Sequence, residues 1–341
     1  MNASQPPFTQ RFGSFPETET PEDALERLAT RLAEARGHIG RIIFGQDLVI
    51  EQTIITLLAG GHALLIGVPG LAKTRLVQTL SIIFGLEDKR VQFTPDLMPA
   101  DILGAEVLEE SETGRRSFRF IKGPIFAQLL MADEINRASP RTQSALLQAM
   151  QERRISVAGQ THELPWPFHV LATQNPLEQE GTYPLPEAQL DRFLMQVDVD
   201  YPDRNAERRM LLATTGPAEE APERVLSAHE LAAAQHLVRR VPVGAHVIEA
   251  ILTLVRAGRP RESELALVRR HVAWGPGPRA SQALLLAARA RAVLEGRLAP
   301  SIDDVLVLAP PVLRHRMALT FAARAEGLTL AAVIEALCRT V

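Results

Sequence analysis

Cysteine is scarce in this sequence, and long hydrophobic runs are missing. The 341 residues contain one cysteine, Cys338, so no disulfide can form within the chain. A lone thiol is typical of a reducing compartment. No apolar run is long enough to cross a bilayer, and the first residues lack the charged-then-apolar pattern of a secretory signal. We therefore predict a cytoplasmic protein with no transmembrane segment.

An excess of charge of one sign is also lacking. The formal net charge of -3 gives no overall attraction to nucleic acid. The sequence holds no dense basic stretch beyond the small group Arg115, Arg116 and Arg119, and its nine histidines form no HExxH motif. These absences argue against a nucleic-acid motor and against a metal-dependent hydrolase with a site of its own. The hydrophobic and charged fractions, 46% and 23%, are typical of a globular protein.

The chain changes character twice along its length. Residues 1–19 are polar, rich in Pro and Ser and without periodicity, which predicts a disordered tail. Over residues 20–202 short apolar runs alternate with helical patterns, which predicts an α/β domain with a parallel sheet between helices. The predicted strands lie at residues 62–66, 91–93, 127–131, 169–172 and 193–199. Over residues 203–341 strand-like runs disappear, which predicts a second, all-helical domain.

The stretch GVPGLAKT at residues 67–74 has the features of a phosphate-binding loop. It follows an apolar run and precedes a helical pattern, so N–H groups at the helix start could face an anion. Gly67 and Gly70 would let the backbone curl around phosphate oxygens. Lys73 would reach the outer phosphates, and the hydroxyl of Thr74 would bind Mg²⁺. A plain strand–turn–helix with a surface lysine is the alternative.

Ala72 departs from the usual pattern, in which glycine precedes the lysine of such a loop. If this position takes helical angles at the start of the helix, a methyl group is tolerated. If it needs a positive φ, alanine is strained.

Two further apolar runs lead directly into polar side chains. Asp133 and Glu134 follow the run at 129–132, and Asn175 follows the run at 169–172. In a parallel sheet these groups would meet at one edge. Asp133 could hold the water shell of Mg²⁺, Glu134 could activate the attacking water, and Asn175 could orient that water. Two solvated acids opening a loop would explain Asp133 and Glu134 alone, but three such strand ends together predict an ATP site.

Taken together, these motifs resemble those of the MoxR group of AAA+ ATPases. The matching segments are GVPGLAKT at 67–74, DLMPADILG at 96–104, DEINRA at 133–138, TQNP at 173–176, YPLPEAQLDRF at 183–193 and PRAS at 278–281. The resemblance covers residues 42–317, and alanine before the lysine is usual in this group. It implies an AAA+ nucleotide-binding core with a P-loop, followed by a small all-α lid domain.

The resemblance also implies roles for individual residues. It assigns ATP binding by the Walker A loop to Gly67, Val68, Pro69, Gly70, Leu71, Ala72, Lys73, Thr74 and Arg75. Asp133 and Glu134 match Walker B, Asn175 matches sensor 1, and Arg279 matches sensor 2. Gly45 and Gln46 match a segment that packs near adenine.

Arg192 matches the arginine finger, which acts on the ATP site of a neighbouring subunit. A local ion pair with Asp191 or Glu187 is the alternative for this residue. Arg137 and Arg141 are competing candidates for the residue that acts in trans.

Two segments have the alternation of β-hairpins. The first covers residues 103–121, with its turn at 111–114, and the second covers residues 154–164. Their positions resemble the helix-2 insert and the pre-sensor-1 hairpin of one AAA+ branch, which project toward a pore or a partner. Hairpins that only complete local packing are the alternative.

The function implied by the resemblance is chaperone-like. MoxR-type proteins form rings, here expected to be hexameric, and hydrolyse ATP with Mg²⁺ to remodel or activate a client protein. They commonly act with a protein that carries a von Willebrand factor A domain. A nucleic-acid motor and a metal-chelatase ATPase subunit share the fold and remain alternatives, although GVPGLAKT and DEINRA favour the MoxR group.

Overall fold

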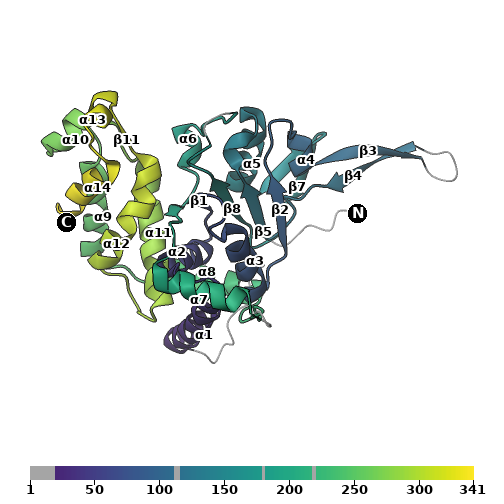
Figure 1. The fold of residues 1–341 in the computed structure, drawn as a ribbon, viewed down its shortest axis with the longest axis horizontal. Coiled ribbons are helices and arrows are strands. Elements are labelled where there is room, and N and C mark those ends of the chain that lie inside the picture. Colours follow the sequence, from purple (N-terminus) through teal and green to yellow (C-terminus); the bar gives the residue numbers. More distant parts are fainter. Residues whose placement is uncertain (1–19, 111–115, 179–180, 217–219) are drawn as a thin grey trace.

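A five-stranded parallel sheet forms the centre of the molecule (Figure 1). The structure is a computed structural model that describes residues 20–110, 116–178, 181–216 and 220–341. The strand order is β2-β5-β8-β1-β9, and each neighbouring pair is parallel. The strands are β1 (Ala63–Ile66), β2 (Asp88–Gln92), β5 (Leu129–Asp133), β8 (His169–Gln174) and β9 (Met195–Asp198). The predicted α/β core with a parallel sheet is confirmed.

The observed strands differ from the predicted ranges at their ends. The run at 91–93 marks only part of β2, which begins at Asp88 with three exposed residues. The strand predicted at 127–131 is shifted, because β5 pairs with β2 as far as Asp133. Apolar runs report burial, whereas strand limits follow backbone pairing, which continues through exposed and charged residues at an edge.

Helices cover both faces of the sheet, and several begin at capping residues visible in the sequence. The Thr20 hydroxyl accepts a hydrogen bond from the Asp23 N–H at the start of α1, and Ser139 caps α5 in the same way. The helices of this region are α1 (Pro21–Ile42), α2 (Asp47–Leu58), α3 (Lys73–Ile83), α4 (Pro99–Leu103), η2 (Ile135–Arg137), α5 (Pro140–Glu152) and α6 (Glu187–Leu190).

The C-terminal region is mainly helical, as predicted. Its helices are α7 (Arg204–Thr214), α8 (Ala228–Arg240), α9 (Ala245–Ala257), α10 (Ala266–His271), α11 (Pro278–Leu294), α12 (Ile302–Leu313), η3 (Arg314–Arg316), α13 (Phe321–Ala325) and α14 (Leu330–Cys338). The expectation that strands disappear is wrong in one detail. The short strands β10 (Val272–Trp274) and β11 (Ala318–Leu319) pair antiparallel, and neither is long enough to leave a periodic pattern in the sequence.

The region after residue 202 packs closely on the sheet and its helices. Gln235 of α8 donates to the Leu57 carbonyl at 2.8 Å and lies 3.0 Å from the ring nitrogen of His169. Arg31 of α1 forms an ion pair with Glu230 of α8. The domain boundary at 202/203 stays a prediction. No helix in the described part of the chain is long and apolar enough to span a membrane.

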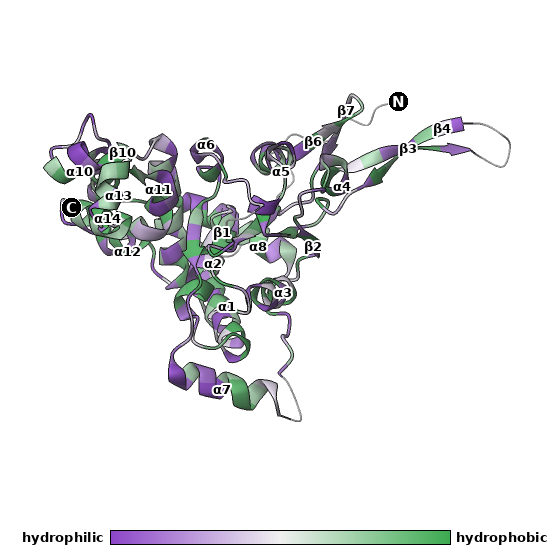
Figure 2. Cartoon of the chain, turned by 45° about the horizontal axis from the view of Figure 1, so that its top comes forward, coloured by the Kyte–Doolittle hydropathy of each residue, from purple (hydrophilic) through white to green (hydrophobic). Residues whose placement is uncertain are grey.

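Both predicted hairpins form. β3 (Gly104–Glu110) pairs with β4 (Arg116–Lys122), and β6 (Arg154–Val157) pairs with β7 (Gln160–Glu163). The ribbon β3–β4 extends away from the rest of the molecule (Figure 1) and includes hydrophobic residues (Figure 2). Its predicted turn at 111–114 lies outside the described residues, as does the tail at 1–19.

The two hairpins touch near the bases of their ribbons. The Phe120 ring stacks on the His162 ring with 4.1 Å between centroids, and both rings contact Phe126 edge to face. The far end of β3–β4 is different, because the opposed residues Leu108 and Phe118 are 54% and 71% exposed.

Ala72 adopts the left-handed conformation, with φ 55° and ψ 20°, immediately before α3. Of the two conformations considered for this position, the structure therefore has the strained one with a positive φ, and not the helical one. The left-handed region costs a non-glycine residue roughly 1–2 kcal/mol. Gly70, two residues earlier, also has a positive φ of 86°, so the loop turns sharply before the helix begins.

We predict that Ala72→Gly raises the free energy of unfolding by up to about 1 kcal/mol. Glycine removes the left-handed strain, while its greater freedom in the unfolded chain offsets about 0.4–1 kcal/mol of the gain. Urea denaturation without nucleotide measures the change. Ala145→Gly in α5 is the control and should lower stability by about 1 kcal/mol. If Ala72→Gly lowered the free energy of unfolding as much as Ala145→Gly does, the left-handed conformation of Ala72 would be contradicted.

Two neutral histidines are buried at the end of the sheet where β1 and β8 begin. The Val170 N–H donates to His62 Nδ1, and His62 Nε2 lies 3.2 Å from the Met150 carbonyl. His169 Nδ1 lies 2.8 Å from the Gly61 carbonyl, and its Nε2 accepts from Gln235. Burial lowers the pKa of His62 to about 3 and that of His169 to about 4.

We predict that stability falls as pH drops below about 6.5, because the unfolded chain then binds protons that the folded chain excludes. Between pH 7 and pH 5 each buried histidine should contribute about 2 kcal/mol to this loss. Urea denaturation at the two pH values should show a smaller difference in His169→Gln than in the wild type. The control is the same substitution at the exposed His229, which should leave the wild-type difference unchanged. If the free energy of unfolding changed with pH as much in His169→Gln as in the wild type, His169 would not be a buried neutral residue.

Candidate active site

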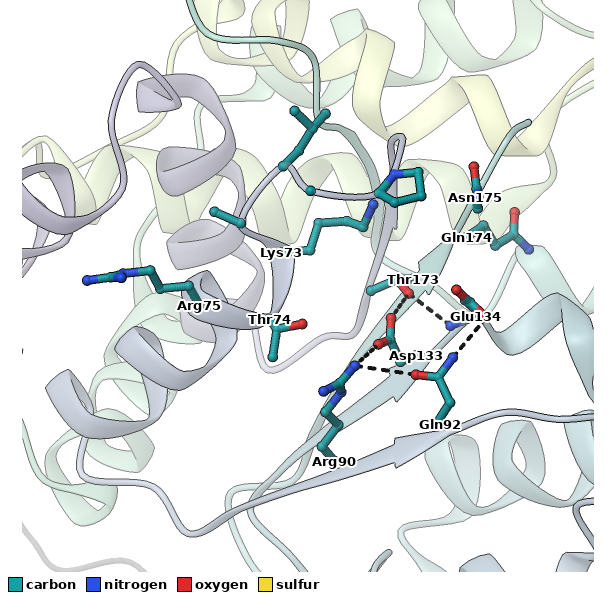
Figure 3. A pocket seen from close by; sticks show the side chains of 14 residues that line it. Lys73, Thr74, Arg75, Arg90, Gln92, Asp133, Glu134, Thr173, Gln174 and Asn175 are labelled. Carbon is teal, nitrogen blue, oxygen red and sulfur yellow. Dashed lines mark hydrogen bonds and ion pairs between the residues drawn. The ribbon is translucent and has the colours of Figure 1, made fainter. Parts of the chain in front are cut away.

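A cavity of about 440 Å³ lies at the carboxyl edge of the sheet, beside the start of α3 (Figure 3). Its volume is within the range of small-molecule sites, about 300–1,000 Å³. It is lined by residues 69–75, Arg90, Gln92, Asp133, Glu134, Thr173, Gln174 and Asn175. Residues from four segments far apart in sequence therefore share one cavity, because parallel strands end at the same edge.

The loop between β1 and α3 encloses the ammonium group of Lys73. Its Nζ donates to the carbonyls of Gly67 at 2.5 Å and Val68 at 2.8 Å. A side chain at Gly67 would lie 2.4 Å from the Val199 carbonyl, so only glycine fits there. Burial lowers the pKa of Lys73, and the nearby carboxylates of Asp133 and Glu134 act in the opposite direction. Gly67 and Val68 thus support the cavity without lining it.

Thr173 connects the two acidic residues at the end of β5. Its hydroxyl donates to Asp133 Oδ1 at 2.5 Å and accepts from the Glu134 N–H at 2.9 Å. Asp133 also accepts from Arg90 Nη2 at 2.6 Å through its other oxygen. The hydroxyl fixes the Asp133 carboxylate, and the backbone of Glu134 turns away from the strand with φ 53°.

The Glu134 carboxylate lies at the rim of the same cavity. Its Oε2 accepts from Gln92 Nε2 at 2.8 Å and from Arg137 at 3.0 Å. Arg137 also lies 3.8 Å from Glu178, and its hydrogen bond with Glu134 raises its pKa. Glu134 is therefore held by two donors of its own chain and points toward the cavity in Figure 3.

Asn175 follows directly from β8 and is buried. Its Oδ1 accepts from the Leu177 N–H at 3.1 Å, which fixes the orientation of the amide. The Thr74 hydroxyl lies on the first turn of α3, on the opposite side of the cavity from Asn175 (Figure 3).

The oxygen donors of the site suit a magnesium ion. Mg²⁺ in nucleotide sites is held by one or two protein oxygens together with phosphate and water. The Thr74 hydroxyl and the Asp133 carboxylate are such donors and both line the cavity. Among the described residues no group of three His, Cys, Asp or Glu side chains could hold a metal by itself. The donor set fits a metal that arrives with a polyphosphate.

Besides Gly67 and Val68, four predicted residues are absent from the cavity lining. Gln46 donates to the Asp200 carbonyl at 2.6 Å, and Gly45 lies against Pro202 and Ala206 at the start of α7. Arg192 and Arg279 are the other two, and neither reaches the cavity of its own chain.

Arg192 follows α6 and Arg279 opens α11, and the two are near enough for their charges to interact. Burial lowers the pKa of Arg192, and the positive charge of Arg279 lowers it further. The Arg192 Nε is buried and has no hydrogen-bond partner among the described residues. Arg279 lies 3.8 Å from Asp191, whose carboxylate accepts from Arg316 at 2.7 Å.

The local ion pair considered for Arg192 does not form. Within the described residues Arg192 makes no ion pair with Asp191 or Glu187. The competing candidates also differ, because Arg137 is paired with Glu134 whereas Arg141 is exposed.

Four residues that line the cavity were not predicted from the sequence: Arg90, Gln92, Thr173 and Gln174. Arg90 and Gln92 are two residues apart on β2, so they lie on one face, and Gln92 is the register partner of Asp133. The alternation in DKRVQ could have indicated that Arg90 and Gln92 share a face of the strand. The strand was predicted at 91–93 and so left out Arg90. Thr173 belongs to the TQNP motif, and its hydroxyl was given no role.

Known families match most of these elements. The profile of the ATPase family associated with various cellular activities (AAA) matches residues 62–195, and that of the AAA lid domain matches residues 264–337. In a crystal structure of a candidate ATPase from Cytophaga hutchinsonii, 97% of the chain superposes on 94% of this chain, with a TM-score of 0.86 and 36% identity.

Full-length relatives give the same result. "Chaperone MoxR1" of Mycobacterium tuberculosis is 41% identical over 96% of this chain and 86% of its own length. "Protein MoxR" of Paracoccus denitrificans is 33% identical over 91% of this chain and 96% of its own length. Both domains, the fold and the full-length similarity agree, and the chain therefore belongs to the MoxR family of AAA+ ATPases.

Proposed function

We propose that this protein hydrolyses ATP with Mg²⁺ and uses the energy to remodel or activate a client protein. The observation that carries the proposal is the meeting of three kinds of group in one cavity. These are the loop with Lys73, the acidic pair Asp133 and Glu134, and the amide of Asn175. A phosphoryl-transfer site requires a phosphate cradle, a metal ligand and groups that position water.

The loop and α3 would bind the phosphates of ATP. N–H groups at the start of α3 and the helix dipole favour negative charge there. Lys73, which now donates to the Gly67 and Val68 carbonyls, would exchange these contacts for phosphate oxygens. Thr74 and Asp133 would hold Mg²⁺, which neutralises charge on the phosphates when it is bound.

Glu134 and Asn175 would act on the attacking water. Glu134 would accept its proton, and the carboxylate already faces the cavity from the end of β5. Asn175 would orient the same water through its amide, which the Leu177 N–H holds in place. Thr173 would keep both acidic residues in position from the neighbouring strand.

We infer that the active unit is a hexameric ring, in which Arg192 and Arg279 serve the ATP site of the neighbouring subunit. Both arginines lie outside the cavity of their own chain and repel each other, and in the described part of the chain Arg192 Nε has no hydrogen-bond partner. A phosphate group from outside the chain would relieve this repulsion. An arginine supplied in this way is worth about 10³–10⁵ in rate.

The client-directed part of the proposal rests on the relatives. One of them is named a chaperone, which favours client remodelling over a nucleic-acid motor or a metal-chelatase subunit. We propose a partner with a von Willebrand factor A domain, a cytoplasmic location and no nucleic-acid partner, in line with the lone cysteine and the absence of a dense basic stretch.

We predict that Lys73→Ala abolishes tight ATP binding, whereas Glu134→Gln retains binding and stops turnover. The lysine contacts phosphate in the ground state, and the glutamate acts only on the attacking water. Nucleotide titration and steady-state hydrolysis separate the two effects. ATP binding by Lys73→Ala with wild-type affinity would show that the loop is not the phosphate cradle.

We predict that Arg192→Ala assembles normally and hydrolyses ATP about 10³-fold more slowly. Mixing it with Lys73→Ala should restore part of the activity, because the intact loop of one subunit then meets the intact arginine of the other. Hydrolysis rates and sizing of the mixtures measure this. Full activity of Arg192→Ala, together with loss in Arg141→Ala, would transfer the role to Arg141.

A further inference from the structure

Arg90 lies outside the family motifs, yet its side chain contacts the acidic end of β5. Its Nη2 lies 2.6 Å from Asp133 Oδ2, and it also donates to Gln92 Oε1 at 3.3 Å. Figure 3 shows the guanidinium reaching from β2 across to the Asp133 carboxylate. Arg90 lines the cavity, so this ion pair forms inside the candidate ATP site.

Both oxygens of Asp133 are engaged in this conformation. Oδ1 accepts from the Thr173 hydroxyl and Oδ2 accepts from Arg90. The Thr173 contact joins neighbouring strands and fixes the carboxylate. The Arg90 contact places a positive charge where a divalent cation would approach, so the two cations exclude each other.

The contact with Arg90 can be exchanged. The Arg90 side chain is 51% exposed, whereas that of Asp133 is 13% exposed. Arg90 can therefore leave the carboxylate without disturbing buried packing. A polyphosphate in the cavity offers the released guanidinium a new acceptor, to which arginine binds well. Lys73 and Arg137 already have other partners, the loop carbonyls and Glu134.

We propose that Arg90 competes with the magnesium ion of the nucleotide for Asp133, and so limits how much Mg²⁺ strengthens nucleotide binding. Arg90 is thus a positioning residue that keeps the metal-binding carboxylate oriented and neutralised until Mg²⁺ and nucleotide arrive together. The proposal rests on the ATP binding proposed above.

The test is the dependence of ATP affinity on Mg²⁺, measured at equilibrium with a fluorescent ATP analogue. The ratio of Kd in EDTA to Kd in saturating Mg²⁺ is compared between the wild type and Arg90→Met. We expect this ratio to rise about two- to fivefold in Arg90→Met, the upper part of the range of an exposed ion pair. Arg90→Lys should stay near the wild-type ratio, because it retains the charge.

Two controls separate competition from general disturbance. Lys89→Met changes the neighbouring exposed residue, which points to the other face of β2, and should leave the ratio unchanged. In an Asp133→Asn background, Arg90→Met should no longer change the ratio, because the shared carboxylate is gone.

Each result has a defined meaning. An unchanged or lower ratio in Arg90→Met, with the wild type binding ATP, would overturn the role of Arg90 and leave the proposed function intact. A rise of equal size in the Asp133→Asn background would also overturn it. Failure of the wild type to bind ATP under either condition would overturn both proposals.

Discussion

The pairing of β5 with β8 is the contact on which the rest of the site depends. The register joins Leu130 to Val170 and Ala132 to Ala172, all fully buried. Because the strands are parallel, the first polar residues after this apolar segment meet at the same edge. The Thr173 hydroxyl can then bridge the Asp133 carboxylate and the next backbone N–H. A slip of one residue would turn these side chains to the other face.

Two of the four non-glycine residues with a positive φ in the described part of the chain lie beside this edge. Ala72 and Glu134 both take left-handed angles, the first before the helix that carries Lys73 and the second at the acidic residue itself. Such conformations persist only where the surroundings fix them. The Glu134 N–H is held by Thr173, and residues after Ala72 are held by α3. Strain therefore accompanies the groups that would contact phosphate and water.

The buried Arg316 of the C-terminal region contacts the segment that carries Arg192. Arg316 donates to Asp191 and to the carbonyls of Phe193 and Leu194, just before β9. Its burial lowers its pKa, and its hydrogen bond with Asp191 counteracts this. The contact ties η3 to the end of α6 and keeps Arg279 beside Arg192, away from the cavity of the same chain. Each chain thus carries two arginines that do not line its own cavity.

The sequence by itself determined the alternation of strands and helices, the loop with Lys73 and the acidic and amide residues at strand ends, because these are local patterns. Tertiary structure decided the rest. The angles of Ala72 depend on the course of the loop between β1 and α3, and the ion pair of Arg90 with Asp133 depends on the pairing of β2 with β5. Neither could be predicted from a local pattern. The position of Arg192 beside Arg279 likewise follows from packing between regions separated by more than 80 residues, a distance at which sequence periodicity carries no information.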